Sequence, residues 1–149
     1  MNRQQKYPNP STFHFYNANP KNRITGDCRI RAISLACKVP YNQVVMDLAK
    51  IQCETGYDQT ANQGISILLK QYGWVKHPQP RKADNTKFTG KEFCKELNCD
   101  ISFVGKSVVA NIGGHHVVCI KEDDLQGLHK VHDIWDSTDG CIGNYWTKG

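Results

Sequence analysis

The chain has 149 residues, of which 39% are hydrophobic and 22% are charged, and its formal net charge is +5. These values are typical of one globular domain, residues 1–149, with enough apolar residues to form a core without cross-links. No segment approaches the roughly 18 consecutive apolar residues of a membrane-spanning helix, so we expect no membrane partner. The basic residues cluster only weakly, at 1–38 and 76–95, and form no continuous stripe, so we expect that nucleic acid is not the main partner.

The N-terminal segment is rich in proline and asparagine, which favours turns and extended chain over helix. We expect residues 1–21 to form an extended arm, in which the aromatic run FHFY at 13–16 forms a strand or packs over the core. The first six residues are polar and basic, and no apolar run follows them, unlike a secretory signal. We therefore expect a cytoplasmic protein.

Apolar residues at helical spacing predict four helices in the middle of the chain. The first covers residues 29–39, the second has Val44 and Leu48 on its apolar face and ends near Gly56, and the third ends at Gly73. The fourth begins at residue 89, where a threonine and a glutamate three positions later form a capping box and two phenylalanines form a hydrophobic staple. Residues 76–86 contain two prolines and are predicted to be a loop.

The last third of the chain changes to short segments rich in β-branched residues. Strands are predicted at 107–112, 116–120 and 131–135, and residues 145–146 could add a further strand. Glycines at 113–114 and a polar turn at 122–127 separate them, as in an antiparallel meander. Helices followed by strands predict an α+β fold, with N-terminal helices packed on a C-terminal antiparallel sheet.

The seven cysteines are odd in number and include no Cys-x-x-Cys pair, which argues against a disulfide framework. We expect reduced thiols, most of them buried as small hydrophobic residues. Cys28 differs because it follows a Gly-Asp turn at the start of the first helix. A thiol at a helix N-terminus, beside a histidine, ionises readily and becomes a nucleophile.

A base for this thiol is available in the segment GGHH at residues 113–116, where glycines precede a buried strand. A general-base histidine also needs an acceptor on its other ring nitrogen. Asp133 and Asp136 lie on or just after the next strand, and a hairpin turn at 122–127 brings residues near 133 or 134 opposite His116. From the residues alone, His115 and His116 are both candidates for the base, and both aspartates are candidates for the acceptor.

This ordered set resembles the papain-like cysteine peptidase superfamily. The resemblance is carried by GDC at residues 26–28, GHHVV at 114–118 and DIW at 133–135. The longer run SVVANIGGHHVV at 107–118 is similar to the bacteriocin-processing peptidases, and the chain as a whole looks most like small phage and bacterial proteins that are predicted to be papain-like peptidases. The resemblance implies a papain-like fold and hydrolysis of a peptide or amide bond in a peptide or protein substrate, without a cofactor or a metal.

The resemblance also implies a role for each matching residue. Cys28 would be the nucleophile, and His116 the base, since the histidine of the family is followed directly by an apolar strand; His115 is the alternative. Asp133 would orient the histidine, in the position where the family often has asparagine, and Asp136 is the alternative orienter.

Two further roles follow from the same resemblance. Trp135 would shield the bond between the histidine and its acceptor from water. Asn22 occupies the position where the family has a glutamine that donates a hydrogen bond to the oxyanion, with the backbone N–H of Cys28 as the second donor. Removal of such a donor typically costs about 3 kcal/mol in the transition state, so Asn22→Ala is expected to slow an enzyme of this type.

Three other functions are compatible with parts of the sequence. A papain-like domain could be a catalytically inactive binding module, because a fold does not determine a function. A structural zinc site is disfavoured, because such sites usually contain closely spaced Cys-x-x-Cys or His-x-x-x-His pairs. Single-stranded nucleic acid could stack on the aromatic residues at 13–16, although packing of these residues on the core is the simpler expectation.

Overall fold

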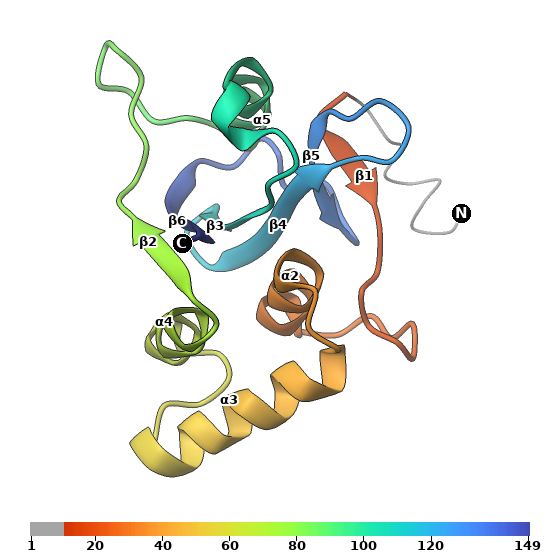
Figure 1. Ribbon diagram of the computed structural model, residues 1–149, viewed down its shortest axis with the longest axis vertical. Helices are drawn as coiled ribbons and strands as arrows, with labels where there is room; N and C mark the ends of the chain where they lie inside the picture. Colours follow the sequence, from red (N-terminus) through yellow and green to blue (C-terminus); the bar gives the residue numbers. More distant parts are fainter. Residues whose placement is uncertain (1–10) are drawn as a thin grey trace.

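A six-stranded sheet forms the centre of the protein, and helices cover both of its faces (Figure 1). The computed structural model describes residues 11–149, so the first ten residues of the predicted arm lie outside the described residues. The strands, in the spatial order β1-β5-β4-β3-β6-β2, are β1 Phe13–Phe15, β2 Trp74–His77, β3 Val108–Ile112, β4 His116–Glu122, β5 His129–Asp133 and β6 Ile142–Lys148. The helices are α2 Cys28–Cys37, α3 Tyr41–Thr55, α4 Asn62–Gln71 and α5 Gly90–Cys99, with a 3₁₀ turn η1 at Ile101–Phe103.

The two faces of the sheet are buried in two separate clusters. Successive side chains of a strand point to opposite faces, so a strand that is covered on both sides has an unbroken apolar run. In β4, Val117 and Cys119 pack with α2, α3 and α4, whereas Val118 and Ile120 pack with α5. This pattern explains why the central strands lack the polar alternation of a one-sided sheet.

The α+β class is confirmed, and the four predicted helices are present with small shifts at their ends. The first helix begins at Cys28 rather than at residue 29, and Lys38 ends it in the left-handed conformation. At α5 the capping box is complete: the Thr89 hydroxyl accepts from the Glu92 N–H at 3.2 Å, and the Glu92 carboxylate accepts from the Thr89 N–H at 3.0 Å. Phe88 and Phe93 pack edge to face, as a hydrophobic staple requires.

The sheet differs from the antiparallel prediction because β1 runs parallel to β5. Phe13 is completely buried and lies beside Val131, so residues 13–15 of the predicted 1–21 arm are a sheet strand. The predicted loop at 76–86 begins with the last two residues of β2, which pairs with β6 at the sheet edge. Trp74, at the start of β2, is 7% exposed, and its burial holds this short segment against the core.

The pairing of β4 and β5 determines where the polar side chains at the ends of these strands can meet. The two strands are antiparallel, so the first residue of β4, His116, and the last residue of β5, Asp133, lie at the same edge of the sheet. Helix α2 packs on β4 and directs its first residue, Cys28, to that edge, where the Val117 backbone N–H faces the thiol. None of the helices within residues 11–149 is long and apolar enough to span a membrane.

Candidate active site

Cys28 is the first residue of α2 and carries a free, partly buried thiol. Asp27 occupies the N-cap position, but its side chain makes no capping hydrogen bond to the helix. The first turn of α2 therefore has no side-chain cap, and the positive end of the helix dipole acts on the sulfur. This environment favours the thiolate over the thiol.

The ring of His116 lies between Cys28 and Asp133. Its Nε2 is 2.5 Å from Oδ2 of Asp133, and the ring interacts on its other side with the thiol of Cys28. Since Asp133 occupies Nε2, Nδ1 is the nitrogen available to the sulfur. The Trp135 ring lies 4.9 Å from the His116 ring, centroid to centroid, and is tilted against it.

The two reactive groups shift each other's pKa. Burial raises the pKa of Cys28, but hydrogen bonding to His116 and to the Val117 N–H, with the charges of His116 and Arg29, outweighs burial and lowers that pKa overall. Burial lowers the pKa of His116, whereas its bonds to Asp133 and Cys28 raise that pKa to about 9. Both shifts favour the pair of thiolate and imidazolium over the neutral pair of thiol and imidazole.

Asp133 is held from behind by a buried arginine that the sequence reasoning missed. Arg31, 5% exposed, donates to Oδ1 of Asp133 at 2.5 Å and to Oδ1 of Asp27 at 2.7 Å. Asp27 also accepts hydrogen bonds from Tyr41 and from Asn19. Both oxygens of Asp133 are thus occupied, and the carboxylate cannot turn away from His116 without losing an ion pair.

No family model, curated protein or solved structure matches this chain. The chemistry of the side chains that meet at Cys28 is therefore what indicates a function. A polarised thiol, an imidazole and an orienting carboxylate form the constellation that attacks carbonyl carbon and transfers an acyl group.

The geometry also separates the predicted alternatives. His115 is exposed to solvent, whereas His116 is half-buried against Asp133. The carboxylate of Asp136 accepts from the N–H and the hydroxyl of Thr138 within its own turn. Of the four candidates, only His116 and Asp133 are joined to each other.

Asn22 is not brought into this arrangement. The chain at residues 17–25 folds into a turn in which the Asn22 N–H donates to the Asn19 carbonyl and the Asn17 amide donates to the Asn22 side-chain oxygen. The Asn22 side chain is exposed, and Asn22 is not among the residues that line the cavity beside Cys28. The expected oxyanion donor is therefore directed into its own turn.

Asn22→Ala is accordingly expected to leave acylation of Cys28 unchanged. Loss of a true oxyanion donor costs about 10²–10³ in rate. Stopped-flow measurement of the acylation rate of the variant distinguishes these outcomes. A decrease of about 10²–10³-fold in that rate would mean that Asn22 does act as the oxyanion donor.

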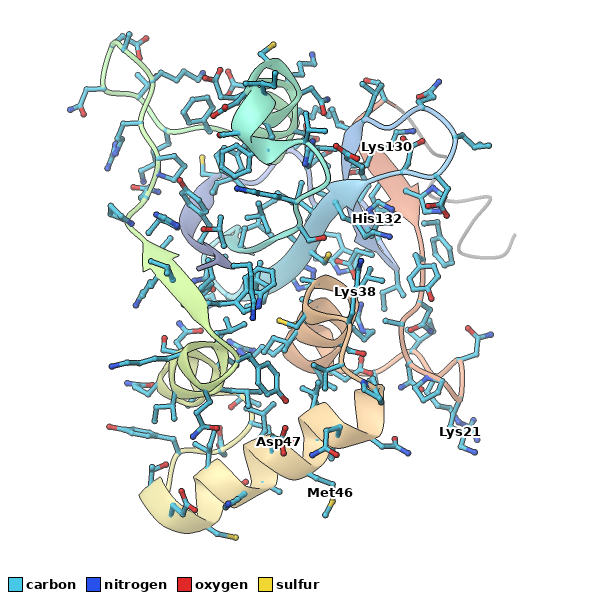
Figure 2. The ribbon with its side chains drawn as sticks, viewed as in Figure 1. Lys21, Lys38, Met46, Asp47, Lys130 and His132 are labelled. Carbon is cyan, nitrogen blue, oxygen red and sulfur yellow. The ribbon has the colours of Figure 1, made fainter. Side chains whose placement is uncertain are left out.

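Another histidine close to α2, His132, takes no part in the contacts that join Cys28, His116 and Asp133. His132 of β5, labelled in Figure 2, lines a small cavity together with Cys28. Burial lowers its pKa to about 4, and its Nδ1 contacts the carbonyl of Lys130. His132 is thus neutral near pH 7 and stacks on His14 rather than on the thiol.

The remaining cysteines differ from Cys28 in their environment. Burial raises the pKa of Cys37 and of Cys94 to about 12 and raises that of Cys119 as well. Three cysteines that were expected to be buried are exposed instead: Cys53, Cys99 and Cys141. Within residues 11–149, no three His, Cys, Asp or Glu side chains gather as metal ligands would.

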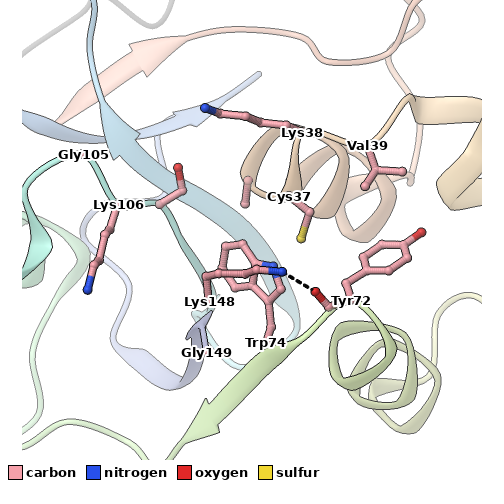
Figure 3. A pocket seen from close by; sticks show the side chains of 11 residues that line it. Cys37, Lys38, Val39, Tyr72, Trp74, Gly105, Lys106, Lys148 and Gly149 are labelled. Carbon is pink, nitrogen blue, oxygen red and sulfur yellow. Dashed lines mark hydrogen bonds between the residues drawn. The ribbon is translucent and has the colours of Figure 1, made fainter.

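Cavities at the sheet edge give a substrate access to the thiol. One of about 270 Å³ is lined by Cys28, His116 and Trp135, and a second of about 350 Å³ is lined by His115, His116 and Trp135. A larger cavity of about 650 Å³ lies at the opposite end of α2, beside Cys37 and Trp74 (Figure 3). That cavity contains no member of the triad, so its volume does not make it the reaction site.

Proposed function

We propose that this chain is a papain-like cysteine hydrolase that cleaves a peptide or amide bond, with Cys28 as nucleophile, His116 as acid and base, and Asp133 as the group that orients His116. The observation that carries the proposal is the placement of one imidazole between a helix-terminal thiol and a buried carboxylate. The order of the three residues along the chain, and the shielding tryptophan at residue 135, are those that the papain-like resemblance implies.

The proposed reaction proceeds in two halves. The Cys28 thiolate attacks the carbonyl carbon, a C–S bond forms, and the carbonyl oxygen becomes an oxyanion. The His116 imidazolium then gives its proton to the departing amine nitrogen as the C–N bond breaks, which leaves a thioester and a neutral imidazole. In the second half, His116 takes a proton from water, the resulting hydroxide displaces the thiolate, and the acid product leaves with both groups restored.

The roles of His116 depend on the environment that Asp133 and Trp135 create. Asp133 fixes the ring so that Nδ1 faces the sulfur, and it stabilises the imidazolium that donates the proton. Trp135 limits access of water to this bond, which strengthens the interaction between the two charges. A neutral acceptor at position 133 would orient the ring but would stabilise the imidazolium less.

The proposal is tested with an activated ester, which needs no knowledge of the natural substrate. Mixing the protein with p-nitrophenyl acetate is expected to give a burst of about one p-nitrophenolate per chain, with the acetyl group on Cys28 by peptide mass spectrometry. Cys28→Ala is expected to abolish the burst, and Cys53→Ala, which removes an exposed thiol, is the matched control.

The same experiment separates the proposal from the inactive binding module. A module that only binds would acetylate Cys28 no faster than Cys53, because its thiol would have no activated partner. That result, in correctly folded protein, would contradict hydrolase function.

A further inference from the structure

The side chain of Arg29 lies next to the nucleophile and has no carboxylate partner. Its Nη1 donates toward the Cys28 sulfur at 3.9 Å, and its Nε is buried without a hydrogen-bond partner among residues 11–149. No ion pair to Arg29 forms within that part of the chain, whereas Arg31, two residues further along α2, is held by two carboxylates. Arg29 is therefore a cation without the acidic partner that partly buried arginines usually have.

The charges around the thiolate alternate in sign from one group to the next. They run from Asp27 to Arg31, Asp133, His116, Cys28 and finally Arg29. Each inner group has a neighbour of opposite charge on both sides. Arg29 is the last group of the series, and the Cys28 thiolate is its only neighbour there. Its guanidinium can therefore move toward another atom when the negative charge shifts from the sulfur to that atom.

In acyl transfer that negative charge moves to the carbonyl oxygen. The oxyanion forms on the carbon that the sulfur attacks and so lies close to the sulfur itself. A donor 3.9 Å from the sulfur in the free protein is too far for a strong bond to the thiolate. The same donor can lie about 3 Å from the oxyanion, the distance that stabilises such intermediates.

The space needed for this contact is present. A cavity of about 360 Å³ is lined by Arg29 together with Thr25 and Gly26. Thr25 and Gly26 also line the cavity that holds Cys28 and His116, so the cavities adjoin. Nothing lies within 4 Å of where a Cβ of Gly26 would be, so the space beside this residue, which lines both cavities, is open.

Asp58 is close enough to Arg29 for the arginine charge to lower the pKa of its carboxyl group, but this carboxylate is hydrogen-bonded elsewhere. Its carboxylate accepts hydrogen bonds from the N–H and the hydroxyl of Thr60. Asp58 is also exposed, so solvent screens its attraction for Arg29. It therefore leaves the guanidinium available to the site.

We propose that Arg29 supplies the oxyanion donor of this site, in the role that the papain-like resemblance implies for Asn22, with the backbone N–H of Cys28 as the second donor. This inference rests on the proposed hydrolase function. Because only interactions that strengthen in the transition state accelerate a reaction, the contact matters through its shortening as charge reaches the oxygen.

Two reactions of the same thiol isolate this role. Acylation by p-nitrophenyl acetate passes through an oxyanion, whereas alkylation by iodoacetamide is a displacement at saturated carbon and forms none. On the pH plateaus, where Cys28 is fully ionised in every variant, Arg29→Met is expected to slow acylation about 10²–10³-fold. Its alkylation of Cys28 is expected to remain within a few-fold of the unaltered protein.

Matched variants complete the test. Arg29→Lys keeps the positive charge but loses the planar guanidinium. Its ratio of acylation rate to alkylation rate is expected to lie between that of the unaltered protein and that of Arg29→Met. Arg81→Met removes an exposed arginine that contacts the Asn85 carbonyl, and is expected to leave both rates unchanged. Thermal unfolding of each variant checks that the fold is retained.

The possible failures are distinguishable. If Arg29→Met slows acylation and alkylation equally, or slows neither, Arg29 is not the oxyanion donor although Cys28 is a nucleophile. If the unaltered protein shows neither a burst nor rapid alkylation of Cys28, the hydrolase function itself fails and the role of Arg29 falls with it.

Discussion

His116→Gln is expected to slow acetylation of Cys28 by about 10²–10⁴-fold at neutral pH, the range that positioned acid–base groups contribute. The imidazolium is the hydrogen-bonding partner that keeps the thiolate populated, and glutamine supplies neither a charge nor a titrating nitrogen. Stopped-flow measurement of p-nitrophenolate release at several ester concentrations gives the acylation rate constant directly.

His115→Gln is the matched control for this prediction. It removes the adjacent, exposed histidine and leaves the pair of His116 and Asp133 in place. Equal losses in the two variants would mean that the ring facing Cys28 is not specifically the base. A loss confined to His115→Gln would reverse the assignment of the two histidines.

Arg31→Met is expected to destabilise the protein by about 3–5 kcal/mol, the usual cost of removing one partner from a buried ion pair. Methionine fills much of the same volume but leaves Asp27 and Asp133, 8% and 2% exposed, without their shared cation. Urea unfolding followed by circular dichroism measures the difference in the free energy of unfolding.

The destabilisation caused by Arg31→Met is expected to decrease as the pH falls. Burial raises the pKa of Asp27, but hydrogen bonds from Tyr41, Arg31 and Asn19 lower it overall, below its ordinary value of 3.8. A carboxyl whose pKa is lowered by folding stabilises the protein above its unfolded pKa, and that contribution is lost as the pH falls through the folded pKa. The difference in the free energy of unfolding between the unaltered protein and Arg31→Met is therefore expected to be largest above about pH 4 and to become smaller below it.

An exposed ion pair provides the comparison. Lys91 and Asp139 lie 2.8 Å apart with side chains 47% and 90% exposed, so Lys91→Met removes a pair that water already screens. Its loss of stability is expected to be small. If Arg31→Met is no more destabilising than Lys91→Met, the buried ion pairs of Arg31 with Asp27 and Asp133 do not stabilise the fold, which would contradict the prediction.

The parts of this protein that local sequence predicts best are those whose causes are local. The capping box at Thr89, the apolar periodicity of α2 and the position of Cys28 at its start all follow from residues within a few positions of one another. The association of His116 with Asp133 also followed, because both flank one polar turn in consecutive strands. The register is shifted, however: the β4–β5 pair nearest to His116 is Cys119 with His132, so Asp133 reaches His116 from beyond the last pair of the ladder.

The parts that the sequence did not predict depend on distant contacts. β1 has only three residues, too few for a periodic pattern, and its parallel pairing depends on where Val131 lies. The orientation of Asn22 depends on a local turn with a positive φ of 54°, which spacing from Cys28 does not reveal.

Arg31 did leave a signal in the sequence. It is a charged residue between the apolar residues Ile30 and Ala32 of the first helix, and charged residues are seldom buried unless paired. The identity of its partner, Asp133, is 102 residues away along the chain and could be learned only from the fold.

Site-resolved alkylation of the protein across a range of pH tests the central claim most directly, because exposed Cys53 serves as an internal reference in the same molecule. The claim is that His116 holds Cys28 as a thiolate. Quenched iodoacetamide labelling, read by peptide mass spectrometry, should give Cys28 a lower pH midpoint than Cys53, and His116→Gln should move that midpoint upward. Identical midpoints for Cys28 and Cys53, unchanged in His116→Gln, would contradict the claim.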